Sequence, residues 1–164
     1  MAIDLSPTTQ DALSRIVQNY NQGLDPALHL NDTDFVFDAP IVNPDAAVSL
    51  RNTRLRAVPT AVSGKIGRAS IYYNRVDLSA INDQPIITRG TATLVSHVVP
   101  MLNEFFGINI VAADYVDGPL PAQVGALTPA TLNATPVALL FIGALAFQLE
   151  NGATLAIRPK PAGG

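Results

Sequence analysis

The first amphipathic pattern in the chain lies in the stretch SPTTQDALSRIVQNYNQG, residues 6–23. Its apolar positions recur with the i, i+3, i+4, i+7 spacing of one helix face: Leu13, Ile16, Val17 and Tyr20. Ser6 or Thr8 is a suitable N-cap, and Gly23 lies just beyond the expected end. We therefore predict a helix whose apolar stripe is buried against the rest of the chain or against a neighbouring subunit.

The next segments predict an extended connector and a strand. Residues 24–45 are rich in Asp, Asn and Pro, with a short strand expected at Phe35–Phe37. In NTRLRAVPT, residues 52–60, apolar or small side chains alternate with arginines. That period of two predicts a strand with charge on one face.

The stretch SIYYNRVDLS, residues 70–79, places several chemically capable side chains close together. Its β-branched and aromatic residues predict a strand, which we expect to be central in a sheet. Side chains alternate along a strand, so Tyr73 and Arg75 should point to one face and Tyr72 and Asn74 to the other. Polar groups divided between two faces do not form a common catalytic pocket. We expect Asn74 and Arg75 to fix the adjoining loops through hydrogen bonds.

A second helix is predicted in TATLVSHVVPMLNEFFG, residues 91–107, with Thr93 as cap and Gly107 as the left-handed stop. Pro100 has no backbone N–H to donate. The helix therefore either begins near Val98 after a looser turn, or bends at the proline.

The last segment, LAFQLENGATLAIRP, contains Asn151-Gly152 between two alternating runs. This dipeptide predicts a type I′ hairpin turn between two antiparallel strands. On that interpretation Phe147 and Leu149 share a face with Leu155 and Ile157. Two other stretches, residues 81–90 and 119–136, are interpreted as loops because glycine, proline and polar residues punctuate them.

The order helix, strands, helix, strands predicts an α+β fold, an antiparallel sheet or sandwich partly covered by helices. We expect an N-terminal helix and extended arm over residues 1–45, a core domain over 46–158 and a flexible tail over 159–164.

Composition narrows the classes of function. Only 14% of the 164 residues are charged, against roughly 25% in a typical soluble domain, and uncharged surface of that kind usually contacts other protein. The net charge of −3 gives no support to nucleic-acid binding. The longest apolar run, Pro136–Leu149, is shorter than the roughly 20 residues a spanning helix needs and is interpreted as a buried strand. The absence of cysteine excludes disulfides and thiolate chemistry.

Candidate catalytic and metal-binding residues do not form a recognisable pattern. NDTD, Asn31 to Asp34, lacks the glycine and closing glutamate of a calcium loop, so we favour an Asx turn. His29 and His97 are far apart in sequence, and no nucleophile motif surrounds any serine. We expect no enzyme activity and no cofactor, with a hydrolase built on scattered carboxylates as one alternative.

Several short motifs carry a resemblance to a known family. They are Asn52-Thr53, Tyr73-Asn74-Arg75 with Asp77-Leu78, the run Val99 to Asn103 with Gly107, and Ala113-Asp114 with Asp117. Over roughly residues 50–157 this pattern resembles a domain of virion structural proteins of tailed bacteriophages. Val99 stands where that pattern usually has leucine.

The resemblance implies a structural component of a phage particle, located in the virion. Its expected partners are other virion proteins and copies of itself, in a homo-oligomer or symmetric assembly, without nucleic acid or membrane. We slightly favour a minor or decoration protein of the head over a tail, neck or baseplate component. Another alternative is a sugar- or surface-binding module that uses Tyr72 or Tyr73 as a stacking platform. The expected interaction and structural residues are Leu13, Ile16, Val17, Tyr20, Tyr72, Tyr73, Asn74, Arg75 and Asp77.

Overall fold

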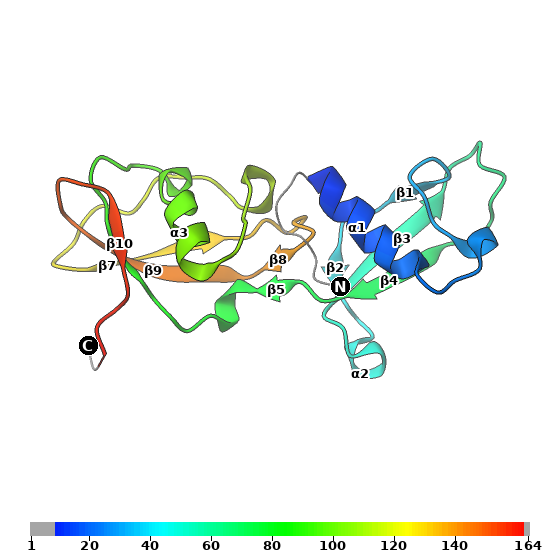
Figure 1. Cartoon of the computed structure of the whole chain (residues 1–164), viewed down its shortest axis with the longest axis horizontal. Helices are drawn as coiled ribbons and strands as arrows, with labels where there is room; N and C mark the ends of the chain where they lie inside the picture. Colours follow the sequence, from blue (N-terminus) through cyan, green and yellow to red (C-terminus); the bar gives the residue numbers. More distant parts are fainter. Residues whose placement is uncertain (1–8, 163–164) are drawn as a thin grey trace. The chain divides into compact units, whose positions relative to one another are not determined.

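The computed structural model describes residues 9–162, and the chain divides into two compact units. The first unit extends to Val76 and also includes Pro136–Leu140, a segment whose neighbours in sequence belong to the second unit. The second unit contains Asp77–Thr135 and the residues from Phe141 onward. Both units contain helices and sheets (Figure 1), so the predicted α+β class is confirmed.

The first unit is a small sheet with one long helix. Its elements are α1 (Thr9–Asn21), the 3-10 turn η1 (Pro26–Leu28), β1 (Phe35–Phe37), β2 (Ile41–Val42), α2 (Ala46–Ser49), β3 (Thr53–Pro59) and β4 (Ala69–Tyr73). β3 is central: it pairs with β4 on one side and with β1 and β2 on the other, always antiparallel. The short strand predicted at Phe35–Phe37 is confirmed.

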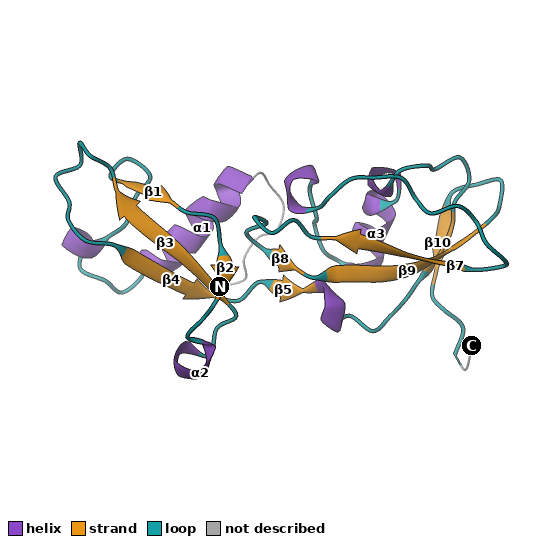
Figure 2. Cartoon of the chain, turned by 180° about the vertical axis from the view of Figure 1, so that it is seen from behind, coloured by secondary structure: helices purple, strands orange, loops and turns teal. Residues whose placement is uncertain are grey.

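Alternation along β3 decides which face of this sheet is covered. Leu55 and Ala57 are fully buried, and Leu55 lies opposite buried Ile71 of β4. The intervening arginines are only half-buried. α1 packs on the buried face, as Figure 1 shows, whereas no helix crosses the face turned toward the viewer in Figure 2. The first unit is therefore a one-sided sheet, with its core between α1 and β3–β4.

The predicted first helix is confirmed, although its proposed caps Ser6 and Thr8 lie outside the described residues. Ile16 and Val17 are buried within the first unit. Of the two expected outcomes, burial against the rest of the chain is the one observed. These side chains therefore offer no apolar area to a neighbouring subunit.

The prediction that residues 70–79 form a central strand is wrong. β4 ends at Tyr73 and pairs with β3 alone, so it is an edge strand. The chain resumes an extended conformation only at β5 (Val76–Asp77). The interruption has a physical cause, because the backbone of Arg75 pairs with the Asn52 side chain instead of with a strand.

The second unit contains a mixed sheet. Its elements are η2 (Leu78–Ala80), β6 (Ile86–Thr88), η3 (Val95–His97), α3 (Val99–Phe106), η4 (Ala112–Asp114), β7 (Thr128–Asn133), β8 (Phe141–Ile142), β9 (Ala144–Glu150) and β10 (Ala156–Arg158). The main sheet has the order β10-β6-β9-β7, and β6 runs parallel to β9. The expectation of a purely antiparallel sheet is therefore corrected for this unit.

The predicted C-terminal hairpin is wrong. β9 and β10 do not pair with each other, because β6 lies between them. Neither Asn151 nor Gly152 has the positive φ that a type I′ turn requires. Ile86 and Ile87 of β6 are almost completely buried. This short apolar strand occupies the position between β9 and β10, so the two strands of the predicted hairpin cannot pair with each other.

The two segments interpreted as loops each contain a strand, β6 and β7. In β7 the burial alternates, with Thr128, Ala130 and Leu132 buried and the residues between them exposed. The pattern was present in the sequence, but Pro129 and weak strand formers concealed it.

The second helix follows the first of the two predicted alternatives. A 3-10 turn precedes α3, Pro100 lies in the first turn of α3, and Gly107 ends the helix with φ of 63°. No helix among the described residues is long and apolar enough to cross a membrane.

The described part of the segment predicted as an arm, residues 1–45, belongs to the first unit with β3 and β4. Residues 159–162 of the predicted tail are exposed and lack regular structure, and the last two residues lie outside the described part of the chain.

The one-sided sheet can be tested with two leucines of the first unit. Leu55→Ala should lower the free energy of unfolding of this unit by about 3 kcal/mol, because it leaves a cavity under α1. Leu28→Ala should change it by less than about 0.5 kcal/mol, since Leu28 is 64% exposed. Urea unfolding followed through NMR signals of the first unit measures both. Equal losses would contradict the assigned core.

Candidate functional site

Two motifs that are separate in the sequence form one hydrogen-bonded cluster in the first unit. The Asn52 side-chain amide donates to the backbone oxygen of Arg75 at 2.8 Å, and its oxygen accepts from the backbone N–H of Arg75 at 2.8 Å. The Asn74 side chain accepts from the backbone N–H of Asn52 at 2.9 Å. Asn74 and the backbone of Arg75 therefore join the start of β3 to the end of β4.

The Arg75 guanidinium is buried, and no carboxylate of the described residues forms an ion pair with it. Its Nε donates to Thr53 Oγ1 at 2.9 Å, and its Nη1 donates to the Ala138 carbonyl at 3.1 Å and to the Pro136 carbonyl at 3.4 Å. Burial lowers the pKa of Arg75, although a guanidinium stays protonated in proteins. Neutral acceptors therefore hold the charge, and the side chain ties residues 136–140 to the sheet.

Tyr73 takes part in the same attachment. Its hydroxyl donates to the Leu139 carbonyl at 2.8 Å, and burial raises its pKa. The Val76 N–H also donates to the Leu140 carbonyl at 2.8 Å. With its hydroxyl bound and its ring half-buried, Tyr73 is not an open stacking platform, whereas Tyr72 on the opposite face is 38% exposed.

The remaining motif residues satisfy backbone groups in the second unit. Asn103 pairs with both backbone groups of Ile110, at 3.0 and 2.9 Å. Asp114 accepts from the N–H of Val111 and Asp117 from that of Ser96. Burial raises the pKa of Asp114, whereas hydrogen bonds from Ser96 lower that of Asp117. These side chains hold loops in place.

His97 and Asp77 have the same kind of role. His97 Nδ1 accepts from the backbone N–H groups of Thr93 and Leu94, and Asp77 accepts from that of Ser79. The predicted interaction residues are thus divided between the two units. Asp77 belongs to the second unit, and all the others belong to the first.

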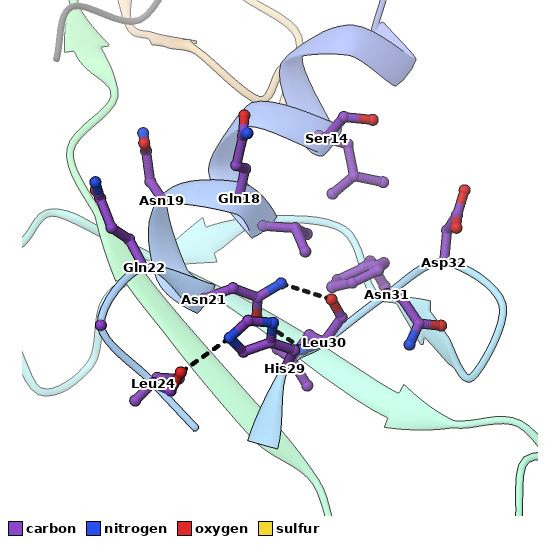
Figure 3. A pocket seen from close by; sticks show the side chains of 14 residues that line it. Ser14, Gln18, Asn19, Asn21, Gln22, Leu24, His29, Leu30, Asn31 and Asp32 are labelled. Atoms are coloured by element: carbon purple, nitrogen blue, oxygen red, sulfur yellow. Dashed lines mark hydrogen bonds between the residues drawn. The ribbon is translucent and has the colours of Figure 1, made fainter. Parts of the chain in front are cut away.

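A groove of about 590 Å³ lies in the first unit between α1 and the connector that follows it. Ser14 and Gln18 come from α1, Gln22 follows the end of that helix, and Asn31 and Asp32 come from the connector (Figure 3). Leu13 and Val17, two of the predicted stripe residues, also line it, and Tyr20 does not. The helical stripe prediction located one wall of this groove but did not recognise it as a cavity.

Short hydrogen bonds fix the closed end of the groove. The Asn21 side chain donates to the Leu30 carbonyl and accepts from the Leu30 N–H, both at 2.7 Å. His29 Nε2 lies 3.0 Å from the Leu24 carbonyl (Figure 3). Because a carbonyl only accepts, Nε2 carries the proton and Nδ1 is left as an acceptor in the neutral ring.

Asn31 forms the Asx turn predicted for NDTD. Its side-chain oxygen accepts from the N–H groups of Thr33 and Asp34, and its amide donates to the Asp34 carboxylate. Among residues 9–162, no group of three histidine or acidic side chains is arranged to hold a metal ion.

The uncovered face of the first-unit sheet forms a second candidate surface, here called the outer face. Its residues, assigned by strand register, are Val36, Ile41, Arg54, Arg56, Val58 and Tyr72. Arg54 lies between Ile41 on one neighbouring strand and Tyr72 on the other. Neither Arg54 nor Arg56 forms an ion pair with any residue that the structure describes. The outer face is thus apolar and cationic at once.

Charge is segregated along the first unit, a signal that the sequence analysis missed. Residues 24–45 contain five aspartates and no Lys or Arg, whereas residues 51–75 contain six Lys or Arg and no acidic residue. Averaging over the whole chain hides this division, since the net charge is only −3.

The groove and the outer face both belong to the first unit of a two-unit α+β protein. The chain belongs to DUF7941, a family of unknown function, whose model matches residues 3–156. No curated protein and no solved structure matches the chain.

The Arg75 cluster can be tested by truncation. Arg75→Ala should lower the free energy of unfolding of the first unit by about 3 kcal/mol, because several buried acceptors lose their donor. Arg75→Lys should rescue little of it, since an ammonium cannot reproduce the Nε and Nη1 geometry. Arg51→Ala, at an exposed arginine, is the matched control. Equal free energies of unfolding in urea for Arg75→Ala and Arg51→Ala would refute the stabilising role of the Arg75 cluster.

Proposed function

We propose that this protein is a non-enzymatic structural component of a tailed-phage particle that acts through contacts between subunits. The observation that carries the proposal is the outer face, a sheet surface on which apolar side chains lie beside two arginines that form no ion pair with any described residue. A decoration or minor head protein remains our first expectation, with a tail, neck or baseplate component as the alternative.

The exposure of the outer face supports a role in protein contact. Val36 is 59% exposed, Ile41 45% and Tyr72 38%, and they lie on three different strands of one sheet. A surface of this kind is unfavourable in water and usually marks an interaction site. Tyrosine and arginine are also among the residues enriched at protein interfaces.

Charge complementarity favours another copy of this chain as the partner. The outer face presents Arg54 and Arg56, whereas the connector of the same unit exposes Asp25 and Asp38. If the cationic face of one copy meets the acidic connector of the next, the contact is head-to-tail. Such contacts close into rings or continue as filaments, which are the assemblies that particle proteins build.

The motifs that resemble those of phage virion proteins support the same proposal in a different way. In this chain they satisfy backbone groups and connect segments. A pattern made of structural side chains preserves a shape without prescribing a reaction. The low charge content of the whole chain is also consistent with a protein that buries surface on assembly.

Charge reversal on the outer face tests the proposal. We expect the purified chain to form oligomers that dissociate as salt is raised, because screening weakens contacts between opposite charges. Arg54→Glu/Arg56→Glu should shift the population to monomer at low salt. Native mass spectrometry and analytical ultracentrifugation measure the effect.

The matched control is Lys65→Glu/Lys160→Glu, which changes net charge equally at two exposed lysines that are not among the residues of the outer face. It should leave the oligomers intact. A wild-type chain that stays monomeric at its highest soluble concentration would refute the assembly. Equal disruption by both double variants would refute the assigned face.

A further inference from the structure

We propose that the groove between α1 and the connector binds a neutral saccharide chain. The inference rests on the chemistry of the groove's lining and is independent of the outer face. No feature of the subunit contact proposed above requires this groove.

Side-chain amides are frequent in the lining. Five of the fourteen described lining residues are Asn or Gln. Asn21 is fully engaged with Leu30, but Gln18, Asn19 and Gln22 have no side-chain hydrogen-bond partner among the described residues. An amide offers both donors and an acceptor. That combination matches hydroxyl groups, each of which also donates and accepts.

The charges of the groove argue against anionic ligands. Among the lining residues that the structure describes there is no Lys or Arg, and the one carboxylate is Asp32. Phosphates, nucleotides and acidic glycans would meet no cation there and would be repelled by Asp32. A carboxylate can instead accept hydrogen bonds from neighbouring hydroxyls of a neutral sugar, and His29 Nδ1 adds a second acceptor.

Apolar side chains complete the match. Val17 and Leu30 are almost fully buried at the base of the groove, and Leu13 and the Phe37 ring are half-buried in its lining. Carbon surface of this kind can pack against the C–H face of a pyranose ring, while the amides reach the hydroxyls at its edge. The volume of about 590 Å³ lies within the range of roughly 300–1,000 Å³ that small-molecule sites occupy.

The site is organised before any ligand arrives. Asn21 and Leu30 form two hydrogen bonds that join the end of α1 to the connector, and Asn31 holds the following turn. A groove whose walls are already joined loses little entropy on binding. The lining amides that have no hydrogen-bond partner among the described residues are the ones we expect to bind the ligand.

The proposal is tested by screening the full chain on an array of neutral and acidic glycans and titrating the hits in ¹H–¹⁵N NMR. Maltotriose, cellotriose and triacetylchitotriose serve as neutral probes, with trigalacturonate as the acidic counterpart. We expect neutral glycans to bind and to shift the side-chain amide signals of Gln18, Asn19 and Gln22. Trigalacturonate should leave these signals unchanged.

Two variants assign the binding to the groove. Gln18→Ala keeps a good helix former on α1, and Gln22→Ala truncates an exposed side chain just after the helix. The double variant should weaken binding of the neutral glycan at least about tenfold, the loss expected for one hydrogen bond or more. Tyr72→Ala removes the exposed tyrosine of the outer face and should leave affinity unchanged. The backbone NMR spectrum of each variant verifies that it is folded.

Several outcomes would overturn the assignment. One is the absence of binding to every neutral glycan on the array, and another is preferential binding of acidic glycans. A loss of affinity in Tyr72→Ala with none in the glutamine variant would transfer the site to the outer face. Displacement of the bound glycan by a peptide of residues 1–8 would identify the groove as a docking site for the chain's own N-terminus.

Discussion

The pairing of the Asn52 side chain with both backbone groups of Arg75 is the interaction on which the first unit depends. It lets the chain leave β4 while the backbone N–H and carbonyl of Arg75 both keep a hydrogen-bond partner. Buried without a partner, these groups would cost free energy. It also places the Arg75 guanidinium where Thr53 and the Ala138 carbonyl can accept from it. One amide therefore positions the side chain that recruits residues 136–140 to this unit.

The same device recurs wherever the backbone turns away from regular structure. Asn21 pairs with both backbone groups of Leu30, and Asn103 does so with Ile110. Each side-chain amide makes the two backbone hydrogen bonds that a neighbouring strand would otherwise make. It thereby fixes a connecting segment that pairs with no strand. The chain can thus keep long connections ordered by amide hydrogen bonds, with few charged side chains. The groove and the outer face are the surfaces of the first unit that stay exposed.

Local patterns predicted the elements whose partners are near in sequence. Three such predictions are confirmed: the apolar stripe of α1, the alternation of β3 and the glycine that ends α3. Each of these features has a local cause.

Long-range partners caused the errors. β6 lies between β9 and β10 because its two isoleucines are better buried than a local hairpin would be, and no turn signal encodes that choice.

Local sequence patterns predicted less of the candidate sites than of the helices and strands. Tyr72 and Arg75 were recognised as important residues, and their division between two faces followed from alternation. The groove was not recognised, because its walls are brought together by Asn21 and Leu30, nine residues apart and outside any motif. The charge segregation behind the outer face was present in the sequence, but it becomes meaningful only when register places Arg54 beside Ile41 and Tyr72.

The most direct test of a structural role is the copy number of this chain in purified phage particles, measured by quantitative mass spectrometry and located in a cryo-electron microscopy map. We expect a fixed stoichiometry that fits the particle symmetry, with the outer face of the first unit covered by a neighbouring subunit. A chain that is absent from particles and recovered only free in the infected cell would contradict it.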